Sequence, residues 1–330
     1  MSDQLREYER FTTINANEIV KPFRNSNDLS GLAVTASSLL PYFALIWLSS
    51  LVAAHSYWWV LLLAVPTHWL HARIFIIMHD CGHRSLFKTD FLNDFFGHIA
   101  GFCFATPFYM WRELHNKHHQ NQGRLQKRGL SLDVWTLTKS EWQAANPLKR
   151  LAYRLYRNPI VLFVIAPVIL FIIIFRLPFE KFSLKAVLNI FILDFIFLSL
   201  ILIVPRTSIS LLTIVAPSLL ISFSAASFLF YIQHQYEKTL WVDEEDFDNR
   251  LISLVGSSYL QLGRFFEWCY GNINYHHIHH LDTKIPMYRL RNAHQSLNTV
   301  QTLPALSPAR AVKSVHLKVW NESTNRLESF

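Results

Sequence analysis

The sequence predicts an all-α integral membrane protein with four or so transmembrane helices and a helical cap on the cytosolic side. Three observations support this fold class. Apolar residues make up 51% of the 330 residues and include 26 Phe and 10 Trp. Several apolar runs are long enough to cross a hydrocarbon core of ~30 Å. Three clusters of histidines lie beside these runs, and no repeat or low-complexity linker divides the chain, so we expect a single domain over residues 1–330.

The first part of the chain is expected to form two membrane-crossing helices. Residues 1–31 are polar and mixed in charge, and this lead-in lacks the apolar core of a signal peptide. The run 32–54 contains 23 residues and no charge, which is enough for one crossing. The run 57–78 carries Trp58 and Trp59 at one end, as an interfacial belt would, and leads into the first histidine cluster.

The second of these runs also contains the polar side chains His68, His71 and Arg73. Polar groups at membrane depth normally face a helix bundle or a cavity. We therefore expect all three to make satisfied polar contacts, with Arg73 supporting the nearby histidine cluster without itself coordinating a metal ion.

Residues 84–157 carry twelve Lys or Arg against five Asp or Glu, the strongest basic excess in the chain. The positive-inside rule places this segment in the cytosol. Together with residues 233–330 it forms the predicted cap. The stretch 91–107 is short and moderately apolar, so we interpret it as an amphipathic or half-buried helix. A crossing there would separate the first two histidine clusters by the membrane.

Three further apolar runs follow, at 158–175, 187–204 and 208–232. An even number of them must cross if all the histidine clusters lie on one side of the membrane. The basic loop 176–185 favours the last two runs as a hairpin, whereas Asp194 within 187–204 argues against it. The sequence leaves open which of the three runs does not span.

The rest of the cap is expected to be helical and polar. Residues 243–248 are acidic and are interpreted as solvated surface, and a helix over 251–271 should deliver the third histidine cluster. A polar tail of mixed charge follows over 289–330.

Charge and cysteine content exclude other classes of protein. The net charge is +8, but no basic stretch carries a nucleic-acid-binding signature, so no nucleic acid partner is expected. Positive charge here fits cytosolic loops and anionic lipid headgroups. Cys81, Cys103 and Cys269 include no CxxC pair, which indicates neither a disulfide framework nor a zinc ribbon and favours a reducing compartment.

The histidine clusters have the spacing of metal ligands on helices. Residues at i, i+3 and i+4 lie on one helix face, so each cluster can direct two or three imidazoles at one point. The clusters contain His79 and His83, then His115, His118 and His119, then His276, His277, His279 and His280. His234 adds a further imidazole at the membrane boundary, at the end of the run 208–232.

Ligand number favours a dinuclear centre over a single metal ion. Imidazole suits iron, copper, zinc and nickel. A membrane hydrolase with one zinc would need three protein ligands and an open position for water, which leaves about five histidines without a task. A dinuclear iron site uses them all and can activate O2. The neighbouring apolar helices then point to oxidation of a lipid chain at the cytosolic face.

The clusters and the residues around them resemble the membrane fatty acid desaturases, which carry three histidine boxes, and in particular their bacterial acyl-lipid branch. The similarity covers roughly residues 20 to 325. Besides the three clusters, the matching positions are 73–78, 93–94, Gly97, Pro107, Trp111, 230–235, 271–273, 281–290 and 317–322.

This resemblance implies a ligand set for two iron ions. The implied ligands are His79, His83, His115, His118, His119, His234, His276, His279 and His280. His277 occupies a variable spacer position, and His98 matches no histidine of the family. We expect His55, His294 and His316 to be ordinary surface residues.

The resemblance also implies the reaction and its partners. A desaturase of this type uses O2 and two electrons from a donor to remove two hydrogens from adjacent methylenes of an acyl chain, leaving a cis double bond. No nicotinamide fingerprint or fused cytochrome b5 motif occurs, so a separate ferredoxin or cytochrome b5 is expected. Arg124, Lys127 and Arg128 form either a docking surface for that acidic donor or a charge cluster that faces lipid or is merely solvated. The expected location is the bacterial cell membrane, with the active site facing the cytoplasm.

Two alternatives remain at this point. The same histidine boxes serve membrane hydroxylases and carotenoid-modifying oxygenases. A non-enzymatic metal transporter or sensor would instead place its ligands along a path through the membrane, whereas these clusters lie in segments predicted to be cytosolic.

Overall fold

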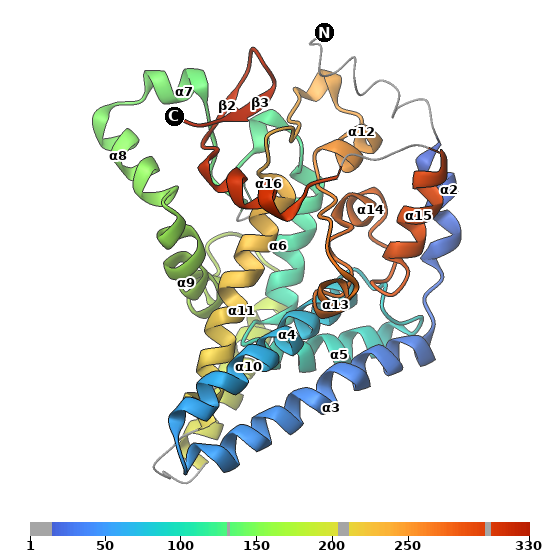
Figure 1. The fold of residues 1–330 in the computed structure, drawn as a ribbon, viewed down its shortest axis with the longest axis vertical. Helices are drawn as coiled ribbons and strands as arrows, with labels where there is room; N and C mark the ends of the chain where they lie inside the picture. The colour runs from blue at the N-terminus through green and yellow to red at the C-terminus, as the bar shows by residue number, and fades with distance from the viewer. Residues whose placement is uncertain (1–14, 131–132, 204–210, 301–304) are drawn as a thin grey trace.

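The computed structural model describes residues 15–130, 133–203, 211–300 and 305–330, and this part of the chain is mostly helical (Figure 1). The α-helices are α2 Ala16–Val20, α3 Asp28–Ala53, α4 Tyr57–Gly82, α5 Asp90–Cys103, α6 Phe108–Asn121, α7 Lys139–Ala144, α8 Pro147–Tyr156, α9 Ala166–Ile172, α10 Leu184–Ile203, α11 Leu211–His234, α12 Asn249–Val255, α13 Arg264–Cys269, α14 His276–Leu281, α15 Leu290–Val300 and α16 Pro308–Lys313. Shorter helical turns are η1 Lys21–Arg24, η2 Leu125–Lys127, the π-helical η3 Val161–Ile165, η4 Ile174–Arg176, η5 Glu244–Asp246 and η6 Ser314–His316.

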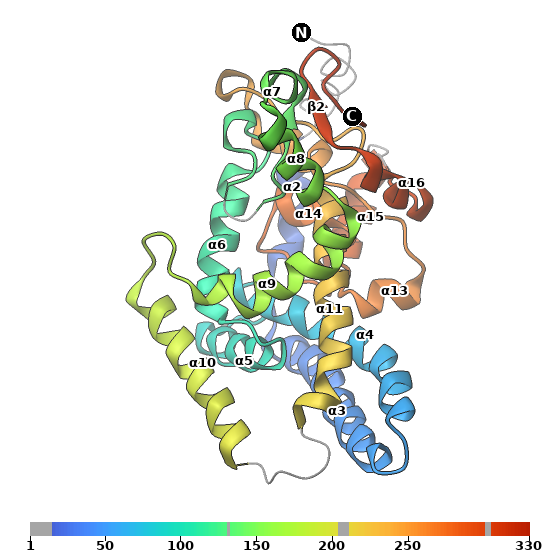
Figure 2. The ribbon, with the colours of Figure 1, turned by 90° about the vertical axis from the view of Figure 1, so that its left-hand side faces the viewer.

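Four described helices, α3, α4, α10 and α11, are long and apolar enough to cross a membrane, which confirms the predicted fold class. Helices α3, α4 and α10 lie in the lower half of Figure 2, and α11 rises from there towards the cap. The run 158–175 does not form one straight helix of this kind, because Pro147–Tyr156 and Val161–Arg176 are bent by 55°. The two later runs form α10 and α11, so the hairpin alternative is the one that the helices favour. Asp194 on α10 is paired with Arg176 at 2.7 Å.

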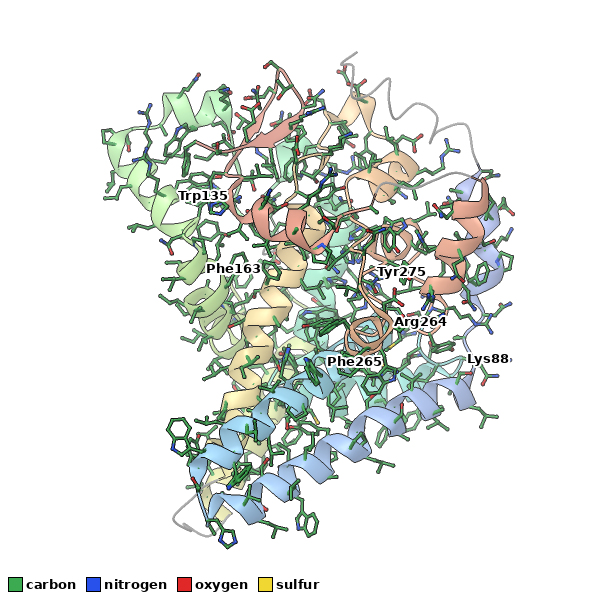
Figure 3. All side chains as sticks on the ribbon, in the orientation of Figure 1. Lys88, Trp135, Phe163, Arg264, Phe265 and Tyr275 are labelled. Carbon is green, nitrogen blue, oxygen red and sulfur yellow. The ribbon has the colours of Figure 1, made fainter. Side chains whose placement is uncertain are left out.

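Burial differs sharply among these four helices. In the most apolar 18-residue stretch of each helix, 61% of α4 is buried, against 28% of α3 and 22% each of α10 and α11. The side chains between α4 and its neighbours fill this interior (Figure 3). The polar side chains of α4 have the satisfied contacts expected of them: His68 with Ser222 at 3.0 Å, His71 with Tyr42 at 3.0 Å, and Arg73 with Ser38 at 3.0 Å.

The cap agrees with the prediction in its first part. Helix α5 is half-buried, and its exposed Phe91 and Phe95 contrast with the buried Asn93 and Gly97, as expected for the stretch 91–107. A feature that the sequence did not predict is a small sheet of β1 Leu137–Thr138, β2 Val319–Asn321 and β3 Arg326–Glu328. Strand β2 pairs parallel to β1 and antiparallel to β3, so the C-terminal tail is fixed to the segment after α6.

The helix predicted over 251–271 is wrong, because α12 ends at Val255 and α13 begins at Arg264. Between them the backbone is drawn into contacts with other segments. The Ser258 amide donates to the carbonyl of Gln233 at 2.9 Å, and the Leu260 amide to that of Asn274 at 3.0 Å. These long-range hydrogen bonds replace the helical ones. They join this segment to the end of α11, just before His234, and to the residues just before His276.

Candidate metal centre

The predicted ligands come together from the ends of four helices. His79 lies in the last turn of α4, and His83 caps the same helix. Helix α6 carries its three histidines near its C-terminal end, α11 ends at His234, and α14 begins at His276. The chain segments are far apart in the sequence, so the site exists only in the folded protein.

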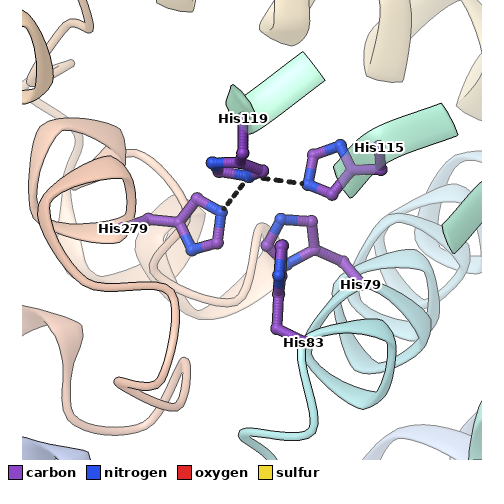
Figure 4. Close-up of side chains that lie close together, drawn as sticks. All are labelled: His79, His83, His115, His119 and His279. Carbon is purple, nitrogen blue, oxygen red and sulfur yellow. Dashed lines mark hydrogen bonds between the residues drawn. The ribbon is translucent and has the colours of Figure 1, made fainter. Parts of the chain in front are cut away.

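The nine histidines form two groups, each able to hold a metal ion. One consists of His79, His83, His115, His119 and His279, and the other of His118, His234, His276 and His280. Within each group the candidate ligand nitrogens lie within 4.8 Å of one another. Figure 4 shows the first group, in which rings from α4, α6 and α14 face a common point.

Helix geometry explains how the second and third clusters are divided between the groups, whereas His79 and His83 of the first cluster share one group. The pairs His115/His119 and His276/His280 are four residues apart, so each pair shares a helix face and a group. His118 and His279 precede the second member of these pairs by one residue. One residue rotates the side chain by about 100° around the helix. The two clusters therefore each contribute a pair to one group and a single imidazole to the other.

The nitrogen spacing within the groups fits metal coordination. The Nε2 atoms of His115 and His119 are 3.0 Å apart, and those of His119 and His279 are 3.1 Å apart. In the second group, His276 Nε2 lies 3.0 Å from the Nε2 atoms of both His234 and His280. Imidazoles at right angles around one ion, with bonds of ~2.1 Å, would place their nitrogens about 3.0 Å apart.

The protonation state and the hydrogen bonding of the rings also fit metal coordination. The buried Nε2 atoms of His79, His83 and His118 have no hydrogen-bond partner among the described residues. Burial lowers the pKa values of His115, His119, His276, His279 and His280 well below 6.5. Neutral rings present lone pairs, and several lone pairs directed at one point repel each other unless a cation lies between them.

Two carboxylates that the sequence analysis missed support one group each. Asp80 Oδ1 lies 3.0 Å from His79 Nδ1, and its Oδ2 accepts the amide of Met287. Asp133 contacts Nδ1 of His118. A ligating histidine usually donates its other ring N–H to such a group, which fixes the tautomer and orients the ring. Asp80 could have been suspected from its position beside His79, but Asp133 is remote in sequence from His118.

Comparison with known proteins identifies the family of the chain. The family model described as "Fatty acid desaturase" matches residues 56–306. The chain belongs to the fatty acid desaturase family. A "Fatty acid desaturase" of Bacillus subtilis is 32% identical over 316 residues, covering 94% of this chain and 89% of that protein. An "sn-1 oleoyl-lipid 12-desaturase" of Synechocystis is 28% identical over 230 residues, covering 68% of this chain and 64% of that protein. The desaturase is thus an oxidoreductase and a membrane protein.

An apolar cavity of about 690 Å³ leads to the centre of the desaturase. Its walls come mainly from α4, α6, α9 and α11, with η3 between α8 and α9, and they include Phe75, Leu162, Phe171, Ala226 and Phe230. The cavity reaches His79, His115, His118 and His276, so it touches both histidine groups. Its volume is in the range of cavities that enclose small-molecule ligands. The bent run 158–175, which does not form a straight span, forms one of its walls.

The other histidines of the desaturase lie outside both groups. His277 is buried and its Nε2 lies 3.0 Å from Nδ1 of His294. The prediction that His294 is a surface residue is wrong, because only 6% of it is exposed and it packs against Tyr259 and Tyr275. His98 contacts Asn189, and His55 and His316 are exposed as expected.

Proposed function

We propose that the desaturase introduces a cis double bond into an acyl chain esterified to a membrane lipid, using O2 at a centre of two iron ions. The observation that carries this proposal is the position of nine imidazoles, seven buried and two half-buried, in two groups at the end of an apolar cavity. Nitrogen ligands in this number suit iron. Two bound irons would supply the activation of O2 that removal of unactivated hydrogens requires.

The histidines, the two carboxylates and the cavity walls each have a role in this reaction. The group of five histidines around His115 would hold one ion, and the group of four around His276 the other. Asp80 and Asp133 would keep a proton on Nδ1 of His79 and His118, so that Nε2 of each ring remains an acceptor directed at the site. The apolar walls exclude water and hold one C–C bond of the chain against the histidines.

The overall reaction requires an external reductant. A –CH2–CH2– unit, O2, two electrons and two protons give –CH=CH– and two molecules of water. Four electrons reduce O2, of which two come from the broken C–H bonds and two from a donor. We propose a separate one-electron carrier protein as this donor, and one similar protein from Nostoc, 31% identical over 94 residues, is named an "sn-1 acyl-lipid omega-3 desaturase (ferredoxin)".

The carrier of the acyl chain and the orientation in the membrane complete the proposal. The names of the cyanobacterial relatives refer to acyl chains on lipids, which supports a lipid-bound substrate here. The basic excess of residues 84–157 supports a cap in the cytoplasm of a bacterial cell. The lipid chains of the surrounding membrane would then enter the cavity beside α9.

Product analysis tests the proposal. The chain should be expressed in a bacterium of known lipid composition, and the lipid and CoA pools should be analysed separately by mass spectrometry. We expect new cis double bonds in lipid-bound chains and none with His119→Ala. A hydroxylated or oxo product without a double bond would contradict desaturation, and double bonds confined to the CoA pool would contradict the lipid-bound substrate.

A further inference from the structure

A second hollow, of about 670 Å³, lies in the cap and shares no lining residue with the apolar cavity. It is bounded by α16, by the chain after α11 and by the extended segment between α12 and α13. In Figure 2, α16 and α6 lie on opposite sides of α11. The hollow therefore offers a separate approach to the histidine centre.

The charged residues that line this hollow are mostly basic, and the rest of its lining is apolar or uncharged. It contains Lys238, Arg310 and Lys313 against a single acid, Glu237, which is paired with Arg326 at 3.4 Å. Arg310 and Lys313 are exposed on α16, and within the described ranges neither makes an ion pair. Solvated cations around a concave surface attract and orient an acidic protein partner.

The floor of the hollow contacts both chain segments that carry the second histidine group. Ser258, in the floor, donates its amide to the carbonyl of Gln233, the residue before His234. Its neighbour Tyr259 lies with its ring 4.3 Å from His294 and 5.6 Å from His277, the residue after His276. These contacts connect the lining of the hollow to residues that adjoin the proposed ligands His234 and His276.

The other candidate surface for an acidic partner, formed by Arg124, Lys127 and Arg128, has two of its three cations paired with glutamates. Arg124 is paired with Glu244 and lies 3.8 Å from the ring of Phe247. Arg128 is paired with Glu141, which leaves Lys127 as the exposed cation of the three. The alternative of a solvated, internally paired charge cluster therefore holds for that stretch, and the hollow is the better docking surface.

We propose that the hollow beside α16 is the docking site of a small acidic electron-carrier protein, which delivers electrons to the centre through the segment Ser258–Tyr259 and the adjoining His234 and His276. This inference rests on the proposed function, because only a reaction that consumes external electrons needs such a partner. The carrier gives up one electron each time it binds, so two binding events supply the two electrons that one turnover requires.

Charge reversal on α16 tests the docking site. We would compare the wild type with R310E/K313E in lipid nanodiscs, using a reduced plant-type [2Fe–2S] ferredoxin as the probe. The KM for ferredoxin should rise about tenfold or more at low salt, and its dependence on ionic strength should weaken. R310Q/K313Q, which removes charge without reversing it, should give a smaller rise. The matched control K127E/K149E makes the same change of charge elsewhere and should leave KM unchanged.

A single-turnover assay separates docking from the chemistry. Dithionite reduces the enzyme directly, O2 is then admitted, and the double bonds formed per site are counted. R310E/K313E should match the wild type here, which also shows that it is folded. An unchanged KM for ferredoxin in R310E/K313E, or an equal rise in K127E/K149E, would overturn the docking site. Failure of the dithionite-reduced wild type to form product would instead contradict the proposed function.

Discussion

The buried and half-buried histidines of the desaturase are of two kinds, and the difference shows what marks a metal ligand. One kind comprises His68, His71, His277 and His294, which are buried but have a hydroxyl group or one other ring as a partner. The other kind comprises the nine histidines of the two groups, whose nitrogens converge on common points. Both kinds are desolvated, so burial does not distinguish them. Convergence of acceptor atoms does.

The largest effect should follow removal of a converging ring. Replacing any of the nine histidines by Ala, for example His234→Ala, should lower desaturation by roughly a hundredfold or more and reduce the iron content, because an ion loses a ligand. Activity should be measured as product per enzyme in nanodiscs, with iron counted in the same samples. His98→Ala, outside both groups, is the control and should retain most activity. Normal activity of His234→Ala would remove that residue from the ligand set.

A smaller effect is expected from the carboxylates behind the rings. Asp80→Asn and Asp133→Asn keep the size of the side chain but remove its charge, so iron affinity should fall by about 10–100-fold. Competition with a chelator measures this change. Asp94→Asn is the matched control, because Asp94 pairs with Arg112 and contacts no histidine of either group. Equal iron retention in all three variants would show that the carboxylates do not tune the centre.

Filling the cavity should affect the substrate and not the metal. Ala226→Phe places a ring in the apolar cavity, so we expect the KM for the acyl lipid to rise about tenfold, with the iron content unchanged. Ala144→Phe adds the same ring at an exposed position of α7 and should change neither quantity. Unaltered kinetics of Ala226→Phe would exclude this cavity as the binding site of the reacting chain.

The smallest effect on activity is expected at the second kind of histidine. His277→Ala leaves His294 without its partner and should lower the free energy of unfolding by about 1–3 kcal/mol, while folded protein stays active. Thermal denaturation compares it with the exposed control His55→Ala, which should match the wild type. Loss of iron from His277→Ala with unchanged stability would reverse this assignment.

The same pair should give the desaturase a pH dependence of stability. Burial lowers the pKa of His294 from 6.5 to about 4. Between these values the unfolded chain binds more protons than the folded one, so stability should fall as pH drops from about 6.5 towards 4. His294→Ala should show a smaller fall over this window in denaturation experiments. An identical pH profile for this variant would exclude His294 as the titrating group.

The helices and the histidine clusters were predictable because their information is local. Apolar runs of 18 or more residues identify spans, and histidines at i, i+3 and i+4 share a helix face. The spacing on α6 and α14 separates a pair from a single imidazole in each of these clusters. Which pair joins which single imidazole depends on how the two helices are rotated towards each other, and no local pattern encodes that. Asp133 and the partner of His277 were missed for the same reason. The sheet escaped prediction because strands of two or three residues have no measurable periodicity.

The predicted helix over 251–271 failed through long-range contacts. Local apolar content favoured a continuous helix, but the amides of Ser258 and Leu260 bond to Gln233 and Asn274 instead. Glycine contributes to the break, since a Cβ at Gly256 would lie 2.6 Å from the carbonyl oxygen of Ile252. The resulting extended segment lines the hollow beside α16, so the proposed docking surface depends on a feature that local sequence patterns do not predict.

The metal content of the purified desaturase tests the central claim most directly. Elemental analysis of protein expressed with iron and zinc both available should find about two irons per chain and far less zinc, since two groups of nitrogen ligands are present. One zinc per chain without iron, in protein that is folded, would contradict the account of a dinuclear iron centre.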